Sequence, residues 1–146
     1  YAVDRFAHSH ILKQALSKGK IIIADRYVSS NLAHQGGKFI NADERRAYMQ
    51  WQYDFEHEKA RLPKPTLNII LHVPTEISMQ LVTDRGNKKD LHEKDEHHLR
   101  RAEETYLELA KLFPNTELIE CCENNKLLTR EQIQELVWEK VQKMLK

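Results

Sequence analysis

Apolar residues recur along this chain alternately at helical and at strand spacing. The first helical stripe carries Val3, Phe6 and Ile11, and a β-branched run follows from Lys20 to Ala24. Helices and short β-branched strands that alternate in this way are typical of an α/β fold with a parallel sheet. In chain order, the pattern predicts a helix over residues 1–17, a strand over 20–24, a helix from 41 that ends before 63, a strand over 66–73, a short helix over 75–83, a long helix ending near 113–114, a strand over 116–121 and a last helix after 129.

Residues that begin and end helices stand at several of these boundaries. Gly19 follows the first helix, where a glycine commonly ends one. Asn41 with Glu44, and Thr129 with Gln132, have the spacing of a capping box, in which two side chains satisfy free backbone N–H groups at a helix start. These signals support the predicted helix boundaries.

Composition allows one domain and favours no charged partner. The chain has 146 residues, 40% of them hydrophobic, which suffices for one modest core, so we expect a single α/β domain over residues 1–146. Its 23 basic and 22 acidic residues give a net charge of +1, so no overall field favours nucleic acid or an anionic membrane. No apolar stretch approaches the roughly 20 residues that span a bilayer, and no secretory pattern opens the chain. We therefore expect a cytoplasmic protein without a membrane or nucleic-acid partner.

Two groups of metal-binding side chains have poor spacing for a metal. Cys121 and Cys122 are neighbours, which rarely pair with each other, so we expect ordinary thiols at a strand end. His97 and His98 are also neighbours and point apart on a helix, so a surface-exposed helix start is favoured over a metal cluster. The full second group is His92, Glu93, Asp95, His97 and His98.

One segment joins an apolar strand directly to charged residues. The run that ends at Ala24 is followed by Asp25, Arg26 and Tyr27 and then by a small polar helix start. Open α/β sheets bind ligands at the carboxyl ends of their strands, so we expect Asp25 and Arg26 at the mouth of a crevice. A guanidinium there can bind a phosphate through two hydrogen bonds, and the carboxylate can orient it or hold a water of a Mg²⁺ shell. The alternative is a plain salt bridge at the strand end.

This segment resembles the signature of thymidylate kinases, an Asp-Arg-aromatic triplet followed by Ser, a polar residue and Ala. Residues 1–5 also resemble the family's aromatic-x-x-Asp-Arg helix, and residues 62–66 resemble the turn before its next strand. With Arg85 and residues 90–106, the resemblance covers nearly the whole chain, and it implies a P-loop-kinase-like, three-layer fold. The residues that match the signature are Asp25, Arg26, Tyr27, Ser30, Asn31 and Ala33.

The resemblance implies two sets of site residues. Asp25, Arg26 and Arg85 are the implied catalytic residues, and Arg85 stands at the root of a lid loop over about residues 84–92, where it neutralises charge on the ATP phosphates. The implied residues that bind the acceptor nucleotide are Tyr1, Asp4, Arg5, Arg26, Ser30, Asn31, His34, Asp90 and His92.

Within the second set, recognition of the base is divided among three side chains. By resemblance, Tyr1 stacks on thymine, Arg5 donates to a thymine carbonyl, and Asn31 addresses the pyrimidine edge with Ser30 beside it. Asp4 can hold Arg5 in place, although neighbouring residues do not share a helix face. For Tyr1 the alternative is a frayed terminal aromatic residue.

Two histidines depart from the family pattern. His34 replaces an aromatic residue that lies near the deoxyribose, which puts the exclusion of ribose in doubt, and an ordinary surface histidine is an equal alternative. His92 stands where an aromatic residue is common. In the lid loop, Lys88 and Lys89 are weaker candidates for phosphate binding, because a solvated charge run explains them as well.

The 146 residues contain no Walker A loop, G-x-x-x-x-G-K-[ST], which cradles the ATP phosphates in this class of kinase. The chain also starts in the middle of what the family makes a helix, so we expect that an N-terminal portion with the first strand and that loop is missing. The resemblance implies transfer of the γ-phosphoryl group from ATP, with Mg²⁺, to dTMP, giving dTDP for dTTP biosynthesis.

The family is commonly homodimeric, and an aromatic stripe of Tyr48, Trp51 and Phe55 on one predicted helix suits either a dimer interface or a core. Two alternatives to the thymidylate reaction stay open. One is another deoxynucleoside or nucleotide kinase, and the other is a non-catalytic module that binds nucleotide or assembles with a partner.

Overall fold

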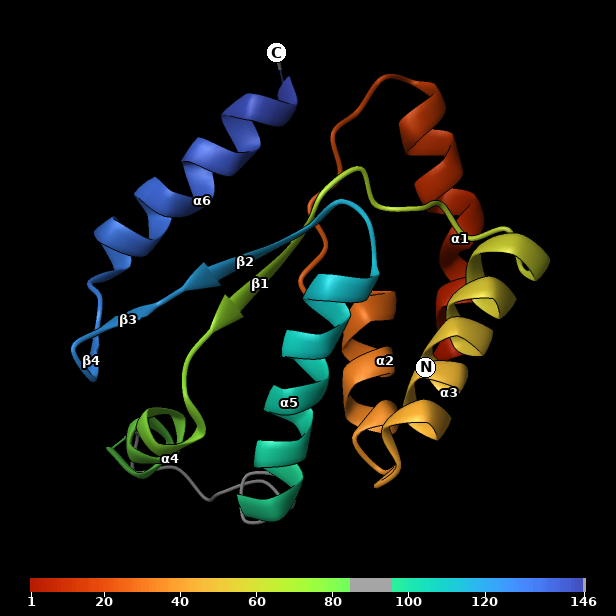
Figure 1. Cartoon of the computed structure of the whole chain (residues 1–146). Coiled ribbons are helices and arrows are strands. Elements are labelled where there is room, and N and C mark those ends of the chain that lie inside the picture. Colours follow the sequence, from red (N-terminus) through yellow and green to blue (C-terminus); the bar gives the residue numbers. More distant parts are fainter. Residues whose placement is uncertain (85–95, 146) are drawn as a thin grey trace. The chain divides into compact units, whose positions relative to one another are not determined.

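The computed structural model describes residues 1–84 and 96–145, and the chain divides into two compact units, Tyr1–Pro65 and Thr66–Lys146 (Figure 1). The first unit is helical and consists of α1 (Ala2–Ser17), α2 (Val28–Gly36), α3 (Ala42–Asp54) and a π-helical turn, η1 (Phe55–Lys59). The second unit consists of β1 (Asn68–His72), α4 (Thr75–Asp84), α5 (Glu96–Leu112), β2 (Thr116–Glu120), β3 (Cys122–Glu123), β4 (Lys126–Leu127) and α6 (Arg130–Leu145). The prediction of one domain over residues 1–146 stays a prediction.

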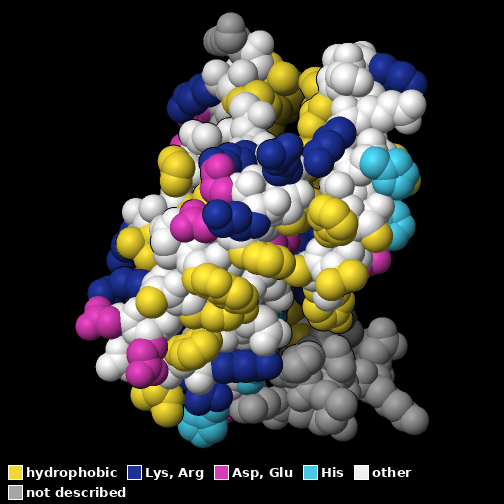
Figure 2. All heavy atoms as spheres, turned by 90° about the vertical axis from the view of Figure 1, so that its right-hand side faces the viewer, with side chains coloured by type: hydrophobic (Ala, Val, Ile, Leu, Met, Phe, Trp, Pro, Cys, Tyr) yellow, Lys and Arg dark blue, Asp and Glu magenta, His cyan; other side chains and the backbone are white. Residues whose placement is uncertain are grey.

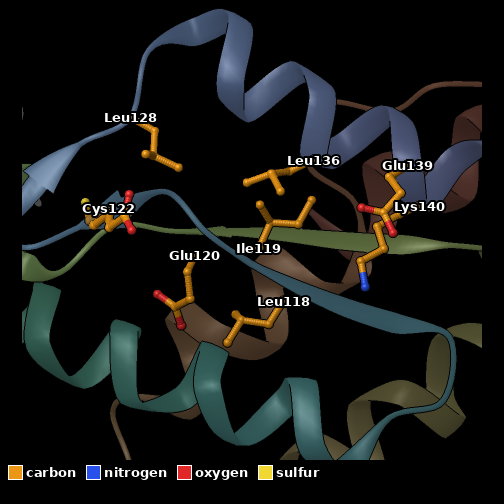
Figure 3. Close-up of a pocket in the computed structure, with 9 residues that line it drawn as sticks. Leu118, Ile119, Glu120, Cys122, Leu128, Leu136, Glu139 and Lys140 are labelled. Carbon is orange, nitrogen blue, oxygen red and sulfur yellow. The ribbon is translucent and has the colours of Figure 1, made fainter.

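The second unit is built around a parallel pair of strands. β1 and β2 run in register from Asn68 opposite Thr116 to His72 opposite Glu120. Helices α5 and α6 lie on opposite sides of this pair (Figures 1 and 3). The result is a layer of strands between two layers of helix, which confirms the predicted α/β class with a parallel sheet.

The predicted helix starts are confirmed by their capping bonds. The Asn41 side chain accepts hydrogen bonds from the backbone N–H groups of Asp43 and Glu44, at 2.8 and 3.1 Å, and so begins α3. At the start of α6, the Thr129 N–H donates to the Gln132 side chain and the Gln132 N–H donates to the Thr129 hydroxyl, at 2.9 and 3.2 Å. This reciprocal pair is a complete capping box.

The segment over residues 20–24 forms no strand, so that prediction was wrong. Gly19, at φ 71°, ends α1 as predicted, and the chain then runs on without a ladder to any other described residue. Ile21 and Ile23 are 71% and 94% exposed. β-branched residues favour the extended backbone, but a strand also needs a partner, and no described segment pairs with this one.

A short hairpin that the hydrophobic pattern did not predict follows β2. Strands β3 and β4 pair antiparallel, with Cys122 opposite Leu127 and Glu123 opposite Lys126. Asn124 and Asn125 form the two-residue turn between them, with positive φ values of 51° and 59°. Asparagine tolerates this left-handed conformation, which matches the twist of a tight hairpin.

Each unit has a small set of buried apolar side chains, and α1 contributes none. Along α1, Val3, Phe6, Ile11 and Leu16 are exposed although they form the predicted helical stripe. The buried residues are Val28, Leu32, Ala33, Met49 and Leu62 in the first unit, and Ile70, Ala102, Leu109, Ile119 and Cys121 in the second.

Candidate functional site

The turn over residues 25–27 has a strained backbone. Arg26 has φ 67°, a left-handed backbone conformation that residues other than glycine rarely adopt. The side chains of Asp25 and Arg26 are exposed, whereas Tyr27 is half-buried and donates its hydroxyl hydrogen to the Pro63 carbonyl at 3.1 Å. Tyr27 therefore anchors the turn, and the strain presents the guanidinium to solvent.

The alternative of a salt bridge at this turn finds no support in the structure. Within residues 1–84 and 96–145, no ion pair involves Asp25 or Arg26. Two exposed charges that are not paired with other described groups are available to a ligand.

Helix α2 begins directly after this turn. Tyr27, the residue in the capping position, makes no side-chain bond to the first turn. The N–H groups of the first turn and the positive end of the helix dipole favour an anion there, and the Arg26 guanidinium adds a full positive charge. Val28 and Leu32 are buried and fix the helix.

The candidate nucleotide-binding residues of α2 lie within its first two turns. Ser30, Asn31 and His34 are all half-buried, and Ser30 and His34 take part in other contacts. Helix α2 packs on α3 within the first unit. The structure thus brings the Asp25–Tyr27 turn, Ser30 and Asn31 onto one short, well-anchored stretch.

Arg5, the candidate for a carbonyl donor, forms a partly buried ion pair that the sequence did not reveal. Its Nε and Nη2 donate to the two carboxylate oxygens of Glu56, at 2.7 and 2.6 Å. Glu56 is completely buried and also accepts a hydrogen bond from the Gln52 amide at 2.6 Å. Burial alone would raise the pKa of Glu56, but the hydrogen bonds from Arg5 and Gln52 outweigh it and hold the pKa below its ordinary value. Glu56 is therefore ionised at neutral pH.

The π-helical turn η1 explains why Glu56 and its neighbour both face inward. A π turn inserts a residue into the helical repeat, and such turns recur at functional sites. In η1, Glu56 and His57 are both buried, and the His57 Nδ1 lies 3.0 Å from the Leu62 carbonyl oxygen. The rings of His57 and Tyr27 lie 6.2 Å apart, which brings the η1 turn close to the Asp25–Tyr27 turn.

The Arg5–Glu56 pair lies close enough to the Asp25–Tyr27 turn to change the pKa of Tyr27. Burial raises the pKa of the Tyr27 hydroxyl, the Glu56 carboxylate raises it further, and the Arg5 guanidinium opposes the rise. Both partners of the pair thus act on the residue next to Arg26. The first unit therefore brings the partly buried Arg5 guanidinium close to the turn that carries Arg26.

The remaining predicted site residues are less well placed or lie elsewhere. Tyr1 is 92% exposed at the start of α1, and Asp4 lies 3.5 Å from His8 rather than against Arg5. Arg85, Asp90 and His92 lie outside the described residues, as do Lys88 and Lys89. The predictions for these five residues stay predictions.

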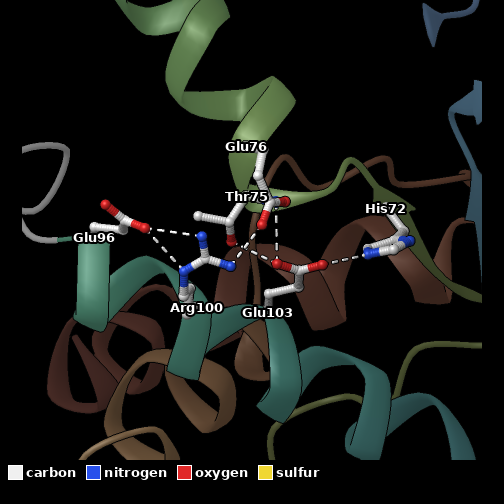
Figure 4. Close-up of polar contacts among 6 residues, drawn as sticks. All are labelled: His72, Thr75, Glu76, Glu96, Arg100 and Glu103. Atoms are coloured by element: carbon white, nitrogen blue, oxygen red, sulfur yellow. Dashed lines mark hydrogen bonds and ion pairs between the residues drawn. The ribbon is translucent and has the colours of Figure 1, made fainter. Parts of the chain in front are cut away.

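The second unit holds a polar network that sequence reasoning missed (Figure 4). His72, at the end of β1, contacts Glu120 through Nδ1 at 2.5 Å and Glu103 through Nε2 at 2.9 Å. Glu103 also accepts from the backbone N–H of Thr75, at 3.0 Å, and from its hydroxyl. Burial lowers the pKa of His72, but the hydrogen bonds to both carboxylates outweigh it and raise the pKa above its ordinary value. Through its two carboxylate partners, the imidazole thus ties β1 and the start of α4 to α5 and β2.

A groove of about 370 Å³ lies between the β2–β3 strands and α6 (Figure 3). Its lining includes no predicted site residue. Burial and the nearby Glu120 raise the pKa of the Cys122 thiol, and both cysteines are free, as expected of ordinary thiols. The lining residues are Leu118, Ile119, Glu120, Cys122, Glu123, Leu128, Leu136, Glu139 and Lys140.

The described residues offer neither a metal cluster nor a membrane-spanning helix. In that part of the chain, no three His, Cys, Asp or Glu side chains are grouped so that they could hold a metal ion. None of the described helices combines the length and the apolar character that crossing a membrane requires.

Comparison with known proteins agrees with the resemblance found in the signature. The sequence profile of the family described as thymidylate kinase matches residues 1–133. A probable thymidylate kinase of Thermococcus gammatolerans is 32% identical over 120 residues, 82% of this chain and 52% of that protein. The thymidylate kinases of Pediococcus pentosaceus and Limosilactobacillus fermentum are 32% and 34% identical over 121 and 119 residues. These matches cover 79% and 78% of this chain and 54% and 52% of the two proteins, so the chain spans about half the length of the curated relatives it matches.

Proposed function

Since the chain belongs to the thymidylate kinase family, we propose that it forms the nucleotide-acceptor part of a kinase that transfers the γ-phosphoryl group of ATP to dTMP and yields dTDP. The observation that carries this proposal is the turn over residues 25–27. Its strained backbone presents the Arg26 guanidinium beside the start of α2, where Tyr27 makes no side-chain capping bond. Two sources of positive potential thus meet at one exposed point, which suits the phosphate of a nucleoside monophosphate.

In phosphoryl transfer, the protein mainly positions the reactants and stabilises charge. Arg26 binds the acceptor phosphate through two hydrogen bonds and holds it for attack on the γ-phosphorus. Asp25 is an exposed single carboxylate, which fits Mg²⁺ because this ion keeps several of its waters when few carboxylates bind it. Asp25 would hold such an ion through its water shell, and the bound ion would supply neutralisation of phosphate charge. Arg85 is the proposed donor-side cation.

Two further residues of the first unit supply the base contacts. Asn31 can both donate to and accept from a pyrimidine edge, and Arg5 supplies a donor for a carbonyl oxygen. Both functions suit thymine, which presents two carbonyls and one ring N–H. Such a reaction belongs to nucleotide metabolism, and the two free cysteines agree with the reducing cytoplasm as its location.

A calorimetric titration of the chain with dTMP tests the proposal. We expect saturable binding that Arg26→Ala weakens by about 10- to 100-fold, because a charge-assisted, bidentate hydrogen bond is lost. Arg46→Ala is the matched control, since Arg46 lies on α3 of the same unit and pairs with Asp43 at the surface. Absence of dTMP binding by a folded chain, or equal loss in both variants, would contradict the proposal.

A turnover assay with ATP, Mg²⁺ and dTMP separates the alternatives. Formation of dTDP would support the kinase. Selective binding of dTMP without any turnover would support a nucleotide-binding module, whereas preference for another monophosphate would support a different nucleotide kinase.

The proposal also includes a second copy of the chain as partner. Four aromatic rings of the first unit lie in a row, with centroid distances of 5.0, 6.0 and 5.8 Å from Phe39 through Tyr48 and Trp51 to Phe55; the outer two pairs are stacked and the middle pair is tilted. Trp51 is nevertheless 59% exposed. Figure 2 faces the side where α1 and α3 lie and shows groups of exposed hydrophobic side chains among charged ones.

Exposed aromatic rows of this kind mark interaction surfaces, and two-fold dimers are the commonest assemblies. Sedimentation velocity on Trp51→Glu tests this part of the proposal. Trp138→Glu is the control, because Trp138 is similarly exposed, at 52%, but lies on α6. We expect only the first variant to shift a dimer to monomer.

A further inference from the structure

We propose that Glu56 is a positioning residue, which fixes the Arg5 guanidinium so that its free edge reads a carbonyl on the base of the bound nucleotide. This inference rests on the proposed function, since it assumes a pyrimidine monophosphate in the first unit. It adds a residue from the π-helical turn η1, 51 positions away from Arg5 in the sequence.

The geometry divides the guanidinium into a used edge and a free edge. A guanidinium carries five N–H groups, and Glu56 takes one on Nε and one on Nη2. The other edge, formed by Nη1 and the second hydrogen of Nη2, points away from Glu56. Within the part of the chain that the structure describes, no hydrogen bond occupies that edge. The Arg5 side chain is only 15% exposed, so this edge is held close to the protein and not spread into solvent.

Three features of the structure immobilise the Glu56 side chain. It is completely buried, one oxygen accepts from both Arg5 and the Gln52 amide, and the π turn sets the direction of its side chain. A long arginine side chain normally samples many rotamers, and two short hydrogen bonds to a fixed carboxylate remove that freedom. The lowered pKa of Glu56 keeps the pair charged at neutral pH.

A buried ion pair is a poor device for stability alone. The loss of hydration offsets much of the attraction between the charges, and apolar residues of the same volume often serve as well. A fixed donor-only edge, in contrast, discriminates between bases. It can donate to the 4-oxo group of a pyrimidine such as thymine. It disfavours a 4-amino pyrimidine such as cytosine, because two hydrogen-bond donors would face each other.

The test compares the affinities of the whole chain for dTMP and dCMP. We measure both by calorimetry for the wild type, Arg5→Ala and Glu56→Gln, and express selectivity as the ratio of the two dissociation constants. We expect Glu56→Gln to lower the ratio about 10-fold or more, toward the value of Arg5→Ala, because the carboxylate that holds the guanidinium is lost.

Glu58→Gln is the matched control, since Glu58 lies in the same η1 turn but pairs with Lys64 at the surface. Its ratio should equal that of the wild type. A purely structural role for Glu56 would lower the folded fraction and so weaken both ligands alike, which leaves the ratio unchanged. An unchanged ratio in folded Glu56→Gln therefore overturns the inference while the proposed function stands.

Two further measurements distinguish failure of this inference from failure of the proposed function. If Glu56→Gln does not fold by circular dichroism, Gln52→Ala decides, because it frees the Glu56 carboxylate without removing its charge. A lowered ratio in Gln52→Ala then supports the inference, and an unchanged ratio overturns it. A folded wild type that binds neither monophosphate overturns the proposed function, and with it the inference.

Discussion

Replacing Arg26 by glycine should leave the first unit more stable than replacing it by alanine. Arg26 has φ 67°, where a Cβ atom crowds the backbone and glycine does not. Both substitutions remove the same exposed side chain, so the difference between them isolates the backbone strain.

The size of the difference follows from two opposing terms. A left-handed conformation costs a residue with a Cβ about 1–2 kcal/mol, which glycine escapes. Glycine in turn gives the unfolded chain more conformational freedom, which destabilises the folded state by about 0.4–1 kcal/mol relative to alanine. The net expectation is that Arg26→Gly exceeds Arg26→Ala by about 1 kcal/mol in the free energy of unfolding.

Urea unfolding followed by tryptophan fluorescence measures this difference. Trp51 reports on the first unit when Trp138, the second tryptophan, is replaced by phenylalanine in every variant. Asp25 supplies the control position, because it is exposed and is not among the residues with positive φ. There the order should invert, with Asp25→Ala more stable than Asp25→Gly by about 0.4–1 kcal/mol. The same order at both positions would refute the strain argument.

Two other predictions concern single contacts. Asn41→Ala should lower the free energy of unfolding of the first unit by about 1 kcal/mol, because the N–H groups of Asp43 and Glu44 lose their cap; Asn41→Ser, another good capping residue, should restore most of it in the same urea assay. Because the pKa of folded His72 is raised above 6.5, its stabilising contribution is complete below about pH 6.5 and is lost as pH rises through the higher folded value. Urea unfolding at a series of pH values measures this, with Trp138 as the reporter in chains that carry Trp51→Phe. The free energy of unfolding should fall more steeply with rising pH in the chain with His72 than in His72→Gln. Equal slopes would count against the network.

Local signals in the sequence predicted the elements that depend on local contacts. The caps at Asn41 and Thr129 were predicted because each capping bond joins residues two or three positions apart. The apolar runs around Ile70 and Ile119 were predicted as strands and are confirmed as β1 and β2. The run at residues 20–24 is also rich in isoleucine but has no ladder, because pairing depends on a partner that the run itself does not specify.

The parts of the candidate site that escaped prediction depend on distance or on backbone geometry. The signature pointed to Arg26, but not to its left-handed backbone, since arginine rarely adopts it. Arg5 was paired with its neighbour Asp4, whereas the structure pairs it with Glu56, 51 positions away. A π turn carries no sequence pattern that would have revealed this. The β3–β4 hairpin, in contrast, had a signal in Asn124–Asn125, a two-residue turn of the kind that favours tight hairpins.

The binding of dTMP to the first unit is the central claim, and an NMR titration tests it most directly. Amide chemical shifts of the ¹⁵N-labelled chain are followed as dTMP is added. The account predicts saturable shifts concentrated over residues 25–31, at the Arg26 turn and the start of α2, and at the side-chain Nε–H of Arg5. Shifts confined to the groove between β2 and α6, or none at residues 25–31 of a folded chain, would contradict it.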